Sequence, residues 1–75
     1  MDEKTDLQYV KVDLDGKAYT YTWDGARKLE NGMIVLLPPD GELRTEPFTG
    51  RVIRETDGPP PGYDGPLKAV IRRVL

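Results

Sequence analysis

Residues 10–23 read VKVDLDGKAYTYTW, and this stretch decides the fold. Its first half alternates Val10, Val12 and Leu14 with charged residues, which is typical of a β-strand with one buried face. Asp15-Gly16 then supplies the two residues, both tolerant of positive φ, that a two-residue hairpin turn requires. The second half alternates again. The sequence therefore predicts a β-hairpin between Leu7 and Trp23.

The second strand of this hairpin carries three aromatic residues at every other position, so they share one face: Tyr19, Tyr21 and Trp23. Two interpretations are open. The rings form the core of a domain that has few large side chains, or they form an exposed platform on which nucleic-acid bases stack. Individual rings can also divide these two roles between them.

Two further segments are predicted to be strands. Residues 33–37 read MIVLL between a glycine and two prolines, and so short a continuous apolar run suits a strand that is buried on both faces. Residues 38–47 then form a loop. Residues 48–56 form the next strand, in which Gly50 indicates a bulge.

The connecting segments are less regular. Residues 24–31 are predicted to be an irregular connection or one helical turn. Residues 57–66 hold four prolines and three glycines, which indicates an ordered turn or a semi-rigid linker without a core of its own. Residues 67–75 fit either a helical or a strand pattern, and their β-branched content favours a closing strand.

Five short strands in one thin domain predict an all-β fold, a small five- to six-stranded OB-like or SH3-like barrel, because closure removes exposed sheet edges. Residues 1–6 are charged and without pattern, so we expect a flexible acidic tail there. Residues 7–75 are expected to form a single small β-barrel domain.

Composition narrows the function. Eleven basic against thirteen acidic residues give a net charge of −2, which argues against coating nucleic acid through charge and restricts any polyanion contact to a local site. The chain has no Cys, His or Ser, so disulfides, the usual zinc ligands and Ser- or Cys-based catalytic pairs are excluded. We therefore expect no enzyme, no cofactor and no metal site. No apolar run approaches the ~20 residues that span a bilayer, which predicts a cytoplasmic protein without membrane contact.

Four segments, in this order, resemble a known family: Tyr19-Thr20-Tyr21, Gly32 to Pro38, Gly50 to Ile53, and Leu67 to Leu75. They are similar to the aromatic-x-Tyr, Gly-x-x-V-x-V-P, Gly-x-V-V and L-K-x-V-x-x-V-L segments of one domain. That domain is the N-terminal 3′-end-binding domain of primosomal protein N′, the bacterial replication-restart helicase. The likeness covers nearly the whole chain after the acidic tail, whereas the helicase and zinc-binding parts of that protein have no counterpart here.

The resemblance implies an OB-like barrel that captures the 3′ end of a DNA strand at a replication fork in a small pocket. It places the nucleic-acid-binding residues at Tyr19 and Thr20, at the turn formed by Pro39, Asp40 and Gly41, and at Lys68. Tyr19 would stack on the terminal base, the turn would meet sugar or phosphate with backbone amides, and Lys68 would neutralise a phosphate. Thr20 stands where the family has an acidic residue.

Two functions follow as hypotheses. In the first, the chain is a stand-alone module that binds DNA 3′ ends or fork junctions. In the second, it is a protein–protein interaction or regulatory module that retains the barrel without DNA binding and has an unidentified protein partner.

Overall fold

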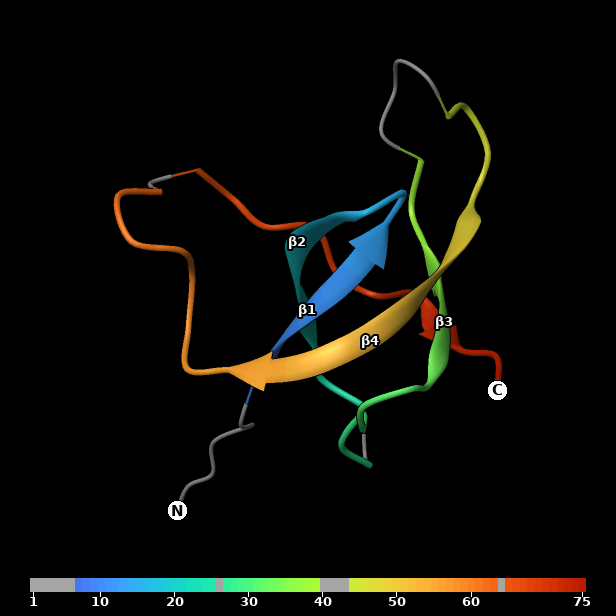
Figure 1. Cartoon of the computed structure of the whole chain (residues 1–75), viewed down its shortest axis with the longest axis horizontal. Helices are drawn as coiled ribbons and strands as arrows, with labels where there is room; N and C mark the ends of the chain where they lie inside the picture. Colours follow the sequence, from blue (N-terminus) through green and yellow to red (C-terminus); the bar gives the residue numbers. More distant parts are fainter. Residues whose placement is uncertain (1–6, 26, 40–43, 64) are drawn as a thin grey trace.

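A computed structural model of the chain describes residues 7–25, 27–39, 44–63 and 65–75. Within them, five strands form one antiparallel sheet in the order β2-β1-β4-β3-β5 (Figure 1). The strands are β1 (Gln8–Leu14), β2 (Lys17–Trp23), β3 (Ile34–Leu37), β4 (Phe48–Thr56) and β5 (Arg72–Arg73). The prediction of a small all-β domain is confirmed. The tail predicted at residues 1–6 lies outside the described residues.

The β1–β2 hairpin forms as predicted. Val12 pairs with Tyr19, and the strands join through Asp15 and Gly16, whose φ angles are 56° and 85°. Positive φ at both central residues defines the turn type whose twist matches that of the flanking strands, and Asp-Gly adopts it at low cost. This hairpin is the local unit on which the rest of the sheet is built.

Strand β3 lies between β4 and β5, and its burial alternates. Val35 and Leu37 are fully buried, whereas Ile34 and Leu36 are half-buried. The prediction of burial on both faces is therefore only partly right, because the described residues cover the outer face of β3 incompletely.

The bulge in β4 lies at Ile53 and not at Gly50. Lys11 pairs with Arg54 and Val12 pairs with Val52, so Ile53 is the extra residue. Gly50 instead keeps regular pairing with Val35 and serves close packing, since a Cβ built there would lie 2.6 Å from the Val12 side chain.

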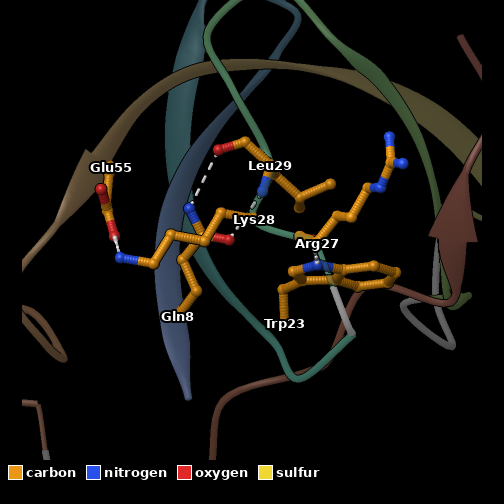
Figure 2. Close-up of polar contacts among 6 residues, drawn as sticks. All are labelled: Gln8, Trp23, Arg27, Lys28, Leu29 and Glu55. Carbon is orange, nitrogen blue, oxygen red and sulfur yellow. Dashed lines mark hydrogen bonds and ion pairs between the residues drawn. The ribbon is translucent and has the colours of Figure 1, made fainter. Parts of the chain in front are cut away.

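The core consists of valine and leucine side chains and one tyrosine, from all four longer strands and two connecting segments: Val10, Val12, Tyr21, Leu29, Val35, Leu37, Val52 and Val70. Two polar residues, Gln8 and Thr20, are also buried, and Gln8 keeps 5% of its surface exposed. Its Nε2 donates to the Leu29 carbonyl (3.0 Å), and its Oε1 accepts from the Leu29 N–H (2.8 Å) (Figure 2). Gln8 therefore fixes the irregular connection between β2 and β3, for which a helical turn was the alternative prediction.

The C-terminal segment is extended, as the strand prediction stated, and it contacts two different strands. Near its start, the Thr22 N–H donates to the Lys68 carbonyl (3.1 Å), and the Val70 N–H donates to the Thr22 carbonyl (2.8 Å). Further on, the Ile71 N–H donates to the Leu36 carbonyl (2.8 Å). Residues 68–75 therefore run from the free edge of β2 to the free edge of β3.

Candidate functional site

An open cleft of about 920 Å³ lies along the free edge of β2. One wall is formed by residues 18–21 of β2 and by the start of the hairpin turn. The opposite wall includes the proline-rich loop that follows β4, and Lys68 lies where the C-terminal segment joins β2. We refer to this feature as the β2 cleft.

The structure brings most of the predicted site residues to this cleft. Tyr19, Thr20 and Lys68 all line it, although 48 positions separate Thr20 from Lys68 in the chain. Pro39 lies next to Lys68, because the Lys68 Nζ donates to the Pro39 carbonyl at 3.1 Å. The other two predicted residues, Asp40 and Gly41, lie outside the described residues.

The three aromatic residues of β2 differ in burial. Tyr21 is 7% exposed and belongs to the core. Trp23 is half-buried against the core, and its Nε1 donates to the Arg27 carbonyl at 2.6 Å (Figure 2). Tyr19 keeps 47% of its surface exposed at the cleft, so its ring is the one that can stack on a ligand.

Thr20 is largely buried, whereas its predicted role in binding DNA requires an accessible side chain. The side chain points to the other face of the sheet from Tyr19, on the side where Lys11 of β1 pairs with it. Its Oγ1 is buried and has no hydrogen-bond partner among the described residues. A bound molecule can reach this hydroxyl only if the side chains that cover it move.

Basic side chains outnumber acidic ones around the cleft. Among the described residues that line it, the cations are Lys11, Lys17, Arg44 and Lys68, and the one carboxylate is Asp15. The Asp15 carboxylate accepts from Arg44 Nη2 at 2.9 Å and is thereby paired. No carboxylate in the described part of the chain pairs with the three lysines. The cleft is therefore locally positive in a chain whose net charge is −2.

Arg44 is held in place from two sides. It pairs with Asp15, and its guanidinium lies 4.5 Å from the centre of the Phe48 ring, which is within the range of a cation–π contact. Sequence reasoning missed Arg44, because a single arginine in a polar loop has no pattern that distinguishes it.

The sequence prediction also missed Tyr63, a lining residue from the proline-rich loop that is 46% exposed. A signal existed: a lone large aromatic residue in a segment rich in proline and glycine contributes no core and is more typical of a binding loop.

The described residues contain no cluster of three or more side chains suited to a metal ion. In the same residues, no helix is long and apolar enough to cross a membrane.

No family model matches this chain, and comparisons with curated protein sequences and with solved structures found no match. A function for this chain must therefore be inferred from the chemistry of the β2 cleft.

Proposed function

We propose that this chain is a non-enzymatic DNA-binding module that captures the 3′ end of a DNA strand, at a free end or a fork junction, in the β2 cleft. The observation that carries the proposal is that the exposed Tyr19 ring and the Lys68 ammonium line one cleft. A ring and a cation at a single cleft match the two parts of a terminal nucleotide, its base and its phosphate.

The fold supports a site of this kind. Residues 68–75 hydrogen-bond to both β2 and β3, the strands at opposite ends of the order β2-β1-β4-β3. This bonding is what closure into an OB-like barrel requires, and we propose that the domain is such a barrel. The C-terminal segment bonds β2 at Thr22, so the cleft occupies the part of the β2 edge that precedes this residue.

The proposed contacts follow from the chemistry of the side chains. Stacking of a base on an aromatic ring such as Tyr19 is worth about 1–3 kcal/mol. The Lys68 ammonium carries three N–H donors, and because the Pro39 carbonyl takes one of them, others can reach a phosphate. Lys11 and Lys17 add to the positive potential. A few local cations suffice for a chain terminus, so the net negative charge does not weigh against this mechanism as it would against a long duplex groove.

The resemblance to the 3′-end-binding domain of primosomal protein N′ supports the same function. Thr20 replaces the acidic residue of that family, and this difference changes which residues we expect to read the nucleotide. Because the Thr20 hydroxyl is covered, we assign the reading of the terminal nucleotide to Tyr19, Lys68 and the exposed backbone edge of β2, and not to the Thr20 side chain.

Fluorescence anisotropy with labelled single strands tests the proposal. Strands with a free 3′ hydroxyl should bind more tightly than the same strands with a blocked 3′ end, and binding should weaken as salt rises. Lys68→Ala should lower the affinity and reduce the salt slope by about one phosphate contact. Lys28→Ala is the matched control, because it removes the same charge at a side chain 75% exposed that pairs with Glu55 outside the cleft.

Two results would refute the proposal. One is the absence of binding at high micromolar protein. The other is equal binding of free and blocked ends, since the proposed site recognises the 3′ terminus itself. An equal effect of Lys68→Ala and Lys28→Ala would remove Lys68 from the site.

A second candidate, a protein-binding module, is favoured by one specific observation. Thr22 uses its backbone N–H and carbonyl to bond the C-terminal segment, so the same groups of Thr20 and Ala18, two and four positions earlier, also point away from β1. Among the described residues no backbone partner meets them. An extended acidic peptide could add there as a strand. Amide shifts at Ala18 and Thr20 on titration with such a peptide, without any response to DNA, would favour this function.

A further inference from the structure

The loop between β4 and the C-terminal segment is ordered by its own backbone. The Tyr63 N–H donates to the Pro60 carbonyl at 3.1 Å, which closes a four-residue turn. Pro61 stands at the second position of the turn and Gly62, with a φ of 81°, at the third, and this pairing is typical of a type II turn. The turn sets the position of the Tyr63 backbone without any contribution from a hydrophobic core.

The Tyr63 ring is fixed at its far end as well. Its hydroxyl donates to the Pro66 carbonyl at 2.6 Å. Gly65 leaves room for this arrangement, since a Cβ built there would already lie 3.2 Å from the Tyr63 hydroxyl oxygen. The ring nevertheless keeps 46% of its surface exposed. A half-exposed ring whose position is held by its surroundings is pre-organised for binding, because little side-chain entropy remains to be lost.

Tyr63 and Tyr19 line the same cleft from different elements. Figure 1 shows the chain leaving the sheet after β4, turning, and returning toward β2. Tyr19 belongs to β2 itself. Lys11 and Lys68 line the cleft together with the two rings. The arrangement thus offers two aromatic rings and cations in one continuous space.

The size of the cleft exceeds what one nucleotide needs. Its volume of about 920 Å³ is near the upper end of the roughly 300–1,000 Å³ found for sites that hold a whole drug-sized ligand. A single terminal nucleotide stacked on Tyr19 would leave the part of the cleft beside the loop unfilled.

We propose that Tyr63 forms a second base-stacking position in the β2 cleft, which takes the nucleotide preceding the 3′-terminal one. This inference rests on the proposed function and adds to it the length of DNA that the cleft reads. The terminal base stacks on Tyr19 and the penultimate base on Tyr63. Lys68 is the cation available to the phosphate that joins the two nucleotides, and Lys11, which projects from the sheet face opposite Tyr19, adds to the positive potential of the cleft.

The test combines protein variants with modified DNA. Three labelled single strands of one sequence are compared by anisotropy: unmodified, abasic at the penultimate position, and abasic at the fourth position from the 3′ end. Wild-type protein should lose roughly 5- to 150-fold in affinity for the penultimate abasic strand, which corresponds to about 1–3 kcal/mol for one stacked base. It should bind the other abasic strand almost as tightly as the unmodified one.

Tyr63→Ala and Tyr63→Phe separate stacking from loop structure. Tyr63→Ala should weaken binding of the unmodified strand by the same factor and abolish the effect of the penultimate abasic site, as expected of two groups in direct contact. Tyr63→Phe removes the hydrogen bond to Pro66 and keeps the ring, so it should still respond to the penultimate abasic site. A merely structural tyrosine would give no such dependence on the DNA.

The outcomes distinguish the inference from the function on which it rests. If wild-type protein binds free 3′ ends but does not respond to the penultimate abasic site, the second position is refuted and 3′-end capture stands. A response that persists unchanged in Tyr63→Ala also refutes it. If no strand binds, both proposals fail. If Tyr63→Ala does not fold, the wild-type comparison still refutes the second position when the penultimate abasic site has no effect, and Tyr63→Phe still tests the ring.

Discussion

Replacing Gln8 by methionine removes two buried hydrogen bonds and keeps an unbranched side chain of similar length. In the folded chain the Gln8 amide bonds both the N–H and the carbonyl of Leu29, at 2.8 and 3.0 Å. Gln8→Met leaves these two backbone groups without their partner. Because Leu29 is also a core residue, the substitution leaves two buried backbone groups unpaired and removes the contact that holds the connection between β2 and β3 in place.

The expected cost follows from these contacts. Each of the two buried polar groups left without a hydrogen bond costs about 1–3 kcal/mol of stability. Burial of the more apolar methionine side chain offsets about 2 kcal/mol of this cost. We therefore expect Gln8→Met to lower the free energy of unfolding by about 2 kcal/mol. A domain of this size has a total stability of about 4–11 kcal/mol, so the change is a large fraction of it.

Urea unfolding followed by fluorescence measures this change, because Trp23 is the only tryptophan in the chain and lies beside the same connection. With a slope of about 1 kcal/mol per molar urea, the midpoint should fall by roughly 2 M. Thr49→Val, a polar-to-apolar change at an exposed position of β4, is the control and should stay within about 0.5 kcal/mol of wild type. Equal midpoints for the two variants would refute the reasoning about Gln8.

Gln8→Glu adds a pH test of the same contact. A protonated carboxyl can donate to the Leu29 carbonyl as the amide does, whereas a carboxylate repels it. Folding therefore raises the pKa of the introduced carboxyl above the value of about 4.3 in the unfolded chain. Relative to wild type, the variant should be most stable below about pH 4 and lose stability as the pH rises through the raised pKa. A difference from wild type that does not change with pH would contradict this account.

Two further predictions concern glycine packing and turn geometry. Gly50→Ala should destabilise the domain by about 1–3 kcal/mol in thermal unfolding, because the added methyl group clashes with the Val12 side chain. Gly58→Ala is the control and should change the stability little, because a Cβ at Gly58 has no atom within 4 Å. Equal effects of the two substitutions would contradict the packing argument. Asp15 has a φ of 56°, which asparagine tolerates and valine does not, so Asp15→Val should lower the free energy of unfolding by about 1–2 kcal/mol more than Asp15→Asn. Both variants lose the exposed ion pair with Arg44, so its small contribution cancels in the comparison.

The candidate site was predictable in part. Tyr19 and Lys68 were expected to contribute, and both line the β2 cleft. The covered position of the Thr20 hydroxyl could not be read from the chain, because it depends on what packs over the outer face of β2. Tyr63 was missed for a related reason. It reaches the cleft only because the loop after β4 returns to β2, and no local pattern in a loop of prolines and glycines encodes that return.

By itself, the sequence determined the hairpin of β1 and β2 and the all-β class. Both depend on neighbours in the chain, namely a repeat of two in the apolar residues and an Asp-Gly pair suited to positive φ. Only the tertiary structure decided the bulge at Ile53, the route of residues 68–75 and the exposure of Tyr19 beside buried Tyr21. These features arise where segments distant in sequence meet, and alternation on a strand cannot tell which ring lies over the core and which lies past its edge.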